Sequence, residues 1–211
     1  RQEHSRETLL ILDIPAADDT LAGALLGATD NNTTGKFTGQ TFDVVDEKIA
    51  GAADAPAALD RLTGAGVTLI IVDLPADALL AASDHLKDSS ALLFNVSAPD
   101  ELLREEACRA NVFHVAPSRA MLADGLAQYL VWKKWPRWLM IKGSHPEDEL
   151  LAQAYRRAAK KFGAKIVEER VYEDLGGGRR SDSGHTQTQR QMPMLTQNAP
   201  AYDVLLAVDE N

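Results

Sequence analysis

The sequence predicts an α/β protein in which parallel sheets are covered by helices. Short apolar runs recur along the chain, helical patterns lie between them, and residues 111–172 read as strand, helix, strand, helix and strand in succession. Runs that are apolar throughout are typical of strands buried on both faces, and their alternation with helices indicates a doubly wound architecture. The five runs are Thr8–Leu12, Thr68–Val72, Ala91–Phe94, Trp138–Ile141 and Val204–Val208.

Two more polar stretches, Thr41–Asp46 and Lys165–Tyr172, predict strands nearer to a sheet edge. Helices are predicted where apolar residues recur at i, i+4 and i+7. One should follow Ser118, which suits an N-cap, and bury Leu122, Leu126, Tyr129 and Leu130. A second stripe consists of Leu151, Ala154, Tyr155, Ala158 and Phe162.

Local signals predict where several elements begin and end. Gly35 should be the C-cap of the first helix. Ser144 and Glu147 have the spacing of a capping box, and a helix start accounts for the His145–Asp148 segment better than a metal site does. Asp174–Ser183 contains three glycines and should be a loop. The three tryptophans, Trp132, Trp135 and Trp138, should form a local core and a partly exposed turn.

Composition excludes several classes of protein. The 211 residues carry a net charge of −9, which argues against nucleic acid as a partner because phosphate binding needs a basic surface. No apolar run is as long as a membrane span. The single cysteine, Cys108, should be a small buried hydrophobe. The chain begins at Arg1 without Met, so we expect that a signal peptide has been removed.

The succession of elements predicts two lobes, 1–117 and 118–211, with the chain crossing at Pro117-Ser118-Arg119. The sequence stops directly after the predicted strand Val204–Val208, whereas a parallel strand is normally followed by a covering helix. We therefore expect the second lobe to be partial and a segment returning to the first lobe to lie outside this sequence.

Candidate binding residues follow from one rule: open α/β sheets bind ligands beyond the carboxyl ends of their strands. In the first lobe this selects Asp73, Asn95 and Ser97. Each of the three could equally serve loop structure and helix capping. In the second lobe and at the crossing the candidates are Arg119, Lys142, His145, Asp209 and Glu210. Arg119 and Lys142 have a simpler alternative, because each could be a solvated surface charge.

Catalytic signatures are absent from the sequence: it has no phosphate-binding loop, no G-x-S-x-G elbow, no H-E-x-x-H and no paired C-x-x-C. An enzyme is therefore the second hypothesis, with Asp73, His145 or Glu210 as acid–base groups. A third hypothesis is the ligand domain of a sensory receptor or regulator.

Three segments carry a family resemblance: ATDNNTTGKFTGQTF at Ala28–Phe42, NVFHVAPSRAMLADGLAQ at Asn111–Gln128 and FGAKIVEE at Phe162–Glu169. Together they resemble the type I periplasmic solute-binding proteins of ABC importers. The resemblance implies a two-lobed periplasmic-binding-protein type I fold, a ligand held in a cleft that closes by a hinge near Pro117–Arg119, no catalysis, a location in the periplasm and a membrane permease as partner.

A narrower resemblance is to the branch associated with alcohol oxidation that depends on pyrroloquinoline quinone (PQQ). It is carried by DDTLAGALLGATDNNTTGKFTGQ, DLPADALL, CRANVFHVAPSRAMLADGLAQYLVWKKW and GHTQTQ. It implies PQQ, a flat tricarboxylate, as the ligand and a PQQ-dependent dehydrogenase as a further partner. Arg119, Lys142 and His145, with Arg179 or Arg180, would supply donors to its carboxylates. Branched-chain amino acids rank lower, because Asp73-Leu74-Pro75-Ala76 lacks the hydroxyl common in amino-acid receptors.

Overall fold

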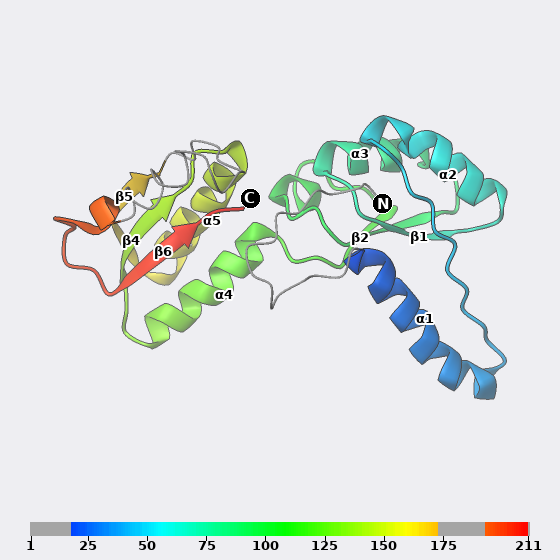
Figure 1. The fold of residues 1–211 in the computed structure, drawn as a ribbon, viewed down its shortest axis with the longest axis horizontal. Coiled ribbons are helices and arrows are strands. Elements are labelled where there is room, and N and C mark those ends of the chain that lie inside the picture. The colour runs from blue at the N-terminus through cyan, green and yellow to red at the C-terminus, as the bar shows by residue number, and fades with distance from the viewer. Residues whose placement is uncertain (1–17, 173–192, 211) are drawn as a thin grey trace, which may run out of the picture. The chain divides into compact units, whose positions relative to one another are not determined.

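The structure, a computed structural model, describes residues 18–172 and 193–210 and divides into two compact units, Arg1–Ala116 and Pro117–Asn211. Each unit contains a parallel sheet of three strands (Figure 1), in the order β1-β2-β3 in the first and β5-β4-β6 in the second. The predicted class, α/β with parallel sheets flanked by helices, is confirmed. The predicted strand Thr8–Leu12 and the predicted loop Asp174–Ser183 lie outside the described residues.

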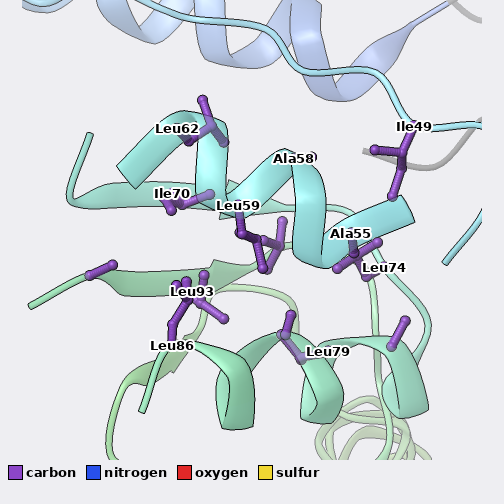
Figure 2. Packing of buried hydrophobic residues seen from close by; sticks show 14 of the residues in the cluster. Ile49, Ala55, Ala58, Leu59, Leu62, Ile70, Leu74, Leu79, Leu86 and Leu93 are labelled. Atoms are coloured by element: carbon purple, nitrogen blue, oxygen red, sulfur yellow. The ribbon is translucent and has the colours of Figure 1, made fainter. Parts of the chain in front are cut away.

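In the first unit, strands β1 (Leu69–Val72), β2 (Leu92–Asn95) and β3 (Val112–His114) pair in parallel. Helix α3 (Ala76–His85) connects β1 to β2, and α2 (Ala55–Gly64) precedes β1; both helices contribute to the core of this unit. The short 3-10 turn η1 (Ala52–Asp54) lies before α2, and η2 (Glu101–Arg104) lies between β2 and β3. The core of this unit joins Leu59 of α2, Leu79 of α3, Ile70 of β1 and Leu93 of β2 (Figure 2).

This sheet is not buried on both faces, contrary to the prediction from its continuous apolar runs. Ile70 and Val72 are buried, but Leu69 is 64% exposed and Ile71 50% exposed. In register with Ile71 across the sheet are Phe94 and Phe113, whose rings stack with centroids 5.5 Å apart. Strands β1 and β2 therefore bury alternate residues, as the two-residue period of a strand requires.

The first helix, α1 (Asp19–Thr38), is longer than predicted. The predicted C-cap, Gly35, was wrong: the helix continues past it, and Gly39 ends it in the left-handed conformation with φ 69°. Gly35 is needed for a different reason, because a Cβ there would stand 2.2 Å from the carbonyl oxygen of Gln40. Asn32 fastens the same turn by exchanging two 2.8 Å hydrogen bonds with the backbone of Phe42.

Two further predictions for the first unit were wrong. Thr41–Asp46, which the structure describes in full, forms no strand. Asn32 holds the backbone of Phe42 within this segment. The apolar side chains Phe42, Val44 and Val45 are exposed there and do not pack in a sheet. Cys108 is exposed rather than buried, since it follows the turn after η2 instead of entering the core.

The second unit is built on β4 (Arg137–Lys142), with β5 (Lys165–Val171) and β6 (Val204–Val208) on either side. As the central strand, β4 has Trp138, Leu139 and Met140 fully buried, so the predicted buried strand is confirmed. The tryptophan prediction also holds: Trp138 lies in the core and donates its indole N–H to the carbonyl of Trp135, while Trp132 and Trp135 are exposed.

Helices α4 (Arg119–Trp132) and α5 (Pro146–Phe162) pack against each other. The predicted cap of α4 is confirmed, because the Ser118 hydroxyl accepts a 3.2 Å bond from the Met121 N–H. Of the predicted buried stripe only Leu130 is buried, whereas Leu122 is 56% exposed and Tyr129 50% exposed. The rest of the stripe's place in the core is taken by small residues. The helix is buried through Ala120, Ala123, Ala127 and Leu130. Small side chains let two helices approach closely, which the larger stripe would prevent.

Helix α5 follows its predicted stripe but not its predicted cap. Ala154 and Ala158 are buried, and Leu151, Tyr155 and Phe162 pack against the same core. The N-cap is His145, not Ser144, and the reciprocal acceptor is Asp148, not Glu147. Pro146 sets this register because it suits the first helical position. Gly163 ends the helix with φ 79°.

Candidate functional site

At the carboxyl edge of the first sheet, Asp73 follows β1 and is 8% exposed. Its carboxylate accepts a 2.8 Å hydrogen bond from the Thr20 hydroxyl near the start of α1. This bond fixes the beginning of α1 to the end of β1. The role agrees with the alternative of loop structure that the sequence left open for Asp73.

Asn95, the last residue of β2, is fully buried and uses its whole amide group within the unit. Its oxygen accepts the N–H groups of Ser97 and Ala98, at 3.2 and 2.9 Å. Its nitrogen donates to the Ala98 carbonyl at 2.8 Å and to His114 Nδ1 at 3.1 Å. Asn95 therefore shapes the loop that carries Ser97.

Ser97 is partly exposed on that loop, and its hydroxyl donates to the Leu74 carbonyl at 3.2 Å. The hydroxyl oxygen keeps its acceptor positions, and the loop backbone beside it is held by Asn95. Of the three candidates in this unit, Ser97 is the one whose surroundings suit contact with a solute.

Sequence reasoning missed His114, at the end of β3. Its Nε2–H donates to the Leu103 carbonyl at 3.2 Å, so Nδ1 is the acceptor that receives the Asn95 amide. Burial, and secondly the charge of Arg104, hold the pKa of His114 below its ordinary value. The imidazole is thus kept neutral as part of the loop support.

In the second unit, Arg119 is buried at the start of α4 and donates from Nε to the Glu210 carboxylate at 2.7 Å. Their side chains are 6% and 21% exposed. Arg119 is therefore not a solvated surface charge, the alternative that the sequence allowed. The pair joins the first turn of α4 to the chain after β6.

Lys142, at the end of β4, is also paired, because its ammonium group contacts Glu149 of α5. Glu149 accepts from Arg156 at 2.8 Å, and Arg156 continues to Glu169 of β5 at 2.6 Å. Bonds from Arg156, and then from Lys142, lower the pKa of Glu149 to about 2. The strand-end rule does not select either glutamate, because Glu149 lies within α5 and Glu169 within β5.

His145 stands half-exposed at the start of α5, with its Nδ1 3.5 Å from the carboxylate of Asp148. Asp148, which the sequence analysis did not select, is fully buried. It accepts the backbone N–H of His145 through Oδ2 and that of Glu210 through Oδ1, each at 2.9 Å. Asp209, next to Glu210, accepts a bond from the Tyr172 hydroxyl.

The structure therefore gathers the candidates in two groups, one in each unit. Asp73, Asn95 and Ser97 share the carboxyl edge of the first sheet. At the edge of the second sheet, a chain of contacts through Asp148 and Glu210 joins His145 to Arg119. Lys142 ends β4, and Asp209 follows the neighbouring strand β6 of the same sheet. Arg179 and Arg180, the remaining predicted donors, lie outside the described residues.

Within residues 18–172 and 193–210, no three His, Cys, Asp or Glu side chains are grouped as a metal ion would require. None of the helices in this part of the chain is both long and apolar enough to cross a bilayer. The polar groups at the carboxyl edges of the two sheets are hydrogen-bond donors and paired charges.

The sequence profile of a family described as periplasmic binding protein matches residues 15–181, which is most of the chain. This chain belongs to that family. Among curated proteins, none matches it.

Solved structures show the same fold at low sequence identity. An ABC transporter substrate-binding protein from Desulfitobacterium hafniense in complex with Leu is 17% identical, with a TM-score of 0.63 over 89% of this chain and 61% of its own. A leucine-, isoleucine-, valine-, threonine- and alanine-binding protein from Brucella ovis is 16% identical, with a TM-score of 0.67 over 95% and 52%. An R. palustris solute-binding protein in complex with benzoate is 11% identical, with a TM-score of 0.58 over 90% and 51%.

This chain thus spans between about half and three fifths of the length of these solved proteins. At these identities the likeness establishes the periplasmic-binding-protein type I fold alone. The predicted cleft between two lobes stays a prediction.

Proposed function

We propose that this protein is a solute-binding protein of an ABC importer that captures a small carboxylate-bearing solute without chemical change. One observation carries the proposal: in a chain of the periplasmic binding protein family, the polar groups chosen by the strand-end rule stand at the carboxyl edges of two parallel sheets. The periplasm is the location, and the membrane permease of the importer is the partner, that this function requires.

The ligand class is supported by the ligands named for similar structures. Leucine and benzoate each carry a carboxylate, although their side groups differ in shape and polarity. PQQ, the ligand implied by the narrower sequence resemblance, carries three. We propose PQQ as the specific ligand, delivered to the importer or held for a PQQ-dependent dehydrogenase, with a branched-chain amino acid as the competing candidate.

The contacts within each unit change the roles expected of individual residues. Arg119 and Lys142 are already paired with Glu210 and Glu149, so a carboxylate ligand would have to compete with an internal carboxylate for either cation. Ser97 and His145 are less committed, and both lie beside backbone N–H groups at a strand end or helix start. We assign direct contact with the ligand to Ser97 and His145 and a supporting role to Arg119.

Calorimetry with PQQ and leucine on the complete protein tests this assignment. We expect Ser97→Ala and His145→Ala each to weaken binding by about tenfold, the loss of a hydrogen bond to a charged group. His85→Ala and Ser89→Ala are matched controls. His85 ends α3 and Ser89 precedes β2, so both lie at the amino edge of the first sheet, away from the carboxyl edge that carries Ser97. Unchanged affinity in both Ser97→Ala and His145→Ala would show that neither residue contacts the ligand.

The enzyme hypothesis makes a different prediction for the same samples. Asp73 belongs to the first unit, whereas His145 and Glu210 belong to the second. Conversion of PQQ or leucine to a product during the titration would favour an enzyme. Recovery of the unchanged solute would favour a receptor.

A further inference from the structure

Asp148 has a fully buried carboxylate, and its surroundings satisfy both of its oxygens. It is the third residue of α5, a position from which a side-chain oxygen reaches back to the backbone N–H of the N-cap. Each carboxylate oxygen accepts one backbone N–H at 2.9 Å. Asp148 thus needs no solvent to be satisfied.

The two N–H groups come from different strand ends. Oδ2 receives the N–H of His145, in the loop between β4 and α5, and Oδ1 receives the N–H of Glu210, just after β6. His145 and Glu210 are 65 positions apart in sequence, yet one side chain fixes the backbone of both. Arg119 then holds the Glu210 side chain from α4.

Gly143 provides the space that this arrangement needs. A Cβ at position 143 would stand 2.2 Å from Asp148 Oδ2 and 2.9 Å from its Cγ, although the backbone of Gly143 lies outside the left-handed region. The Gly143 N–H donates to the Val208 carbonyl at 2.9 Å, so the same residue also ties β4 to β6. Glycine is required here by the close approach of the carboxylate.

We propose that Asp148 is the positioning residue of the binding edge in the second unit. It fixes the loop of His145 and the chain at Asp209-Glu210 in one geometry, so that their groups meet the ligand without reorganising. This inference rests on the proposed function, because it assigns His145 to ligand contact. Preorganised groups bind more tightly because less conformational freedom is lost on binding.

Asp148→Asn tests the proposal with almost no change of shape. The amide keeps one acceptor oxygen but presents an NH2 group to the other backbone N–H, so one of the two loops must be released. Hydrogen exchange at the His145 and Glu210 amides should accelerate by at least tenfold, and affinity for PQQ or leucine should fall by a similar factor. Gly143→Ala should have the same two effects by displacing the carboxylate.

Glu147→Gln is the matched control, because Glu147 is an exposed acid in the same helical turn and should change neither quantity. A general loss of stability would lower the unfolding temperature but leave the affinity of the folded fraction unchanged. That result, or unaltered exchange at both amides in Asp148→Asn, would overturn the positioning role. Failure of the unmutated protein to bind any carboxylate solute would instead overturn the proposed function.

Discussion

Arg119 illustrates how the context of a single residue decides its role. Its place at the crossing between predicted lobes suggested a cation aimed at a ligand, but the guanidinium is buried and bonded to Glu210. A buried ion pair adds little to folding stability compared with apolar residues in its place. Removing one partner is costly, however, because the other charge is left poorly compensated. Arg119 is therefore most visible in the stability of the second unit.

We expect Arg119→Ala to lower the free energy of unfolding by about 3 kcal/mol, the lower end for breaking a buried pair, because Glu210 retains some contact with water. Arg137→Ala is the control, since Arg137 pairs with Asp203 in an exposed position and should have a much smaller effect. Denaturant unfolding measures both. Equal losses would show that burial of Arg119 is not what matters.

His114 gives the first unit a dependence on pH with a defined sign. Its pKa is lowered in the folded chain, mainly by burial, so the folded state binds fewer protons than the unfolded state near neutrality. The stabilisation is therefore present above the unfolded value of about 6.5 and is lost as pH falls through it. A proton on Nδ1 would also oppose the bond from the Asn95 amide.

Unfolding free energies between about pH 8 and 5 should accordingly decline more steeply in the wild type than in His114→Gln. Glutamine retains one donor and one acceptor but does not titrate in this range. The comparison isolates His114 from the remaining histidines. Parallel curves for the two proteins would contradict the account.

At the scale of elements, β1 places neighbouring apolar residues on opposite faces of its sheet, one buried and one exposed. Ile70 points into the core with Leu59 and Leu93, whereas Ile71 is half exposed on the opposite face. Ile70→Ala should cost about 2–5 kcal/mol through loss of buried surface and the cavity left behind. Ile71→Ala should cost about 1 kcal/mol or less.

Chemical denaturation of these two variants tests which face of the sheet is buried. The neighbouring positions have the same side chain and the same strand, so strand propensity is matched. A larger loss for Ile71→Ala would mean that the exposed face is covered in solution. That result would contradict the orientation of β1.

The turn at the end of α1 offers a second comparison within one element. Gly23 has no atom within 4 Å of an added Cβ, whereas Gly35 would meet the Gln40 carbonyl. Gly23→Ala should stabilise the helix by about 1 kcal/mol, and Gly35→Ala should forfeit that gain by opening the turn. Helical circular dichroism during thermal unfolding would show the difference. Similar stabilisation by both changes would exclude the close contact.

These elements also show what can be read from the sequence. The strands at Leu69–Val72, Arg137–Lys142 and Val204–Val208 were predictable because a short apolar run has few other stable uses. The buried face of α4 was not, because the helix packs through alanines while leaving Leu122 exposed. Periodicity locates an apolar face but does not say which partner covers it.

The candidate site was predictable to a similar degree. The strand-end rule selected residues that do end or follow parallel strands, among them Lys142, Asp209 and Asn95. The rule could not find Asp148, because its importance lies in its hydrogen bonds to the His145 loop and to a chain segment 62 positions away. Pairs such as Arg119 and Glu210, 91 positions apart, are likewise set by the tertiary fold.

At the scale of the whole molecule, each unit has its own parallel sheet, its own apolar core and its own group of polar strand ends. The family match spans residues from both units. The proposed function requires selectivity for a solute, whereas a purely structural protein would have no reason to be selective. Selectivity for the carboxylate is therefore the central claim to test.

The most direct measurement is a calorimetric titration of the complete protein with three matched pairs of solutes: PQQ and its trimethyl ester, leucine and leucinamide, and benzoate and benzamide. We predict saturable one-to-one binding of at least one carboxylate, recovery of that solute unchanged, and at least tenfold weaker binding of its counterpart without a carboxylate. A folded protein that binds none of the carboxylates, binds each pair equally or converts the solute would contradict the account.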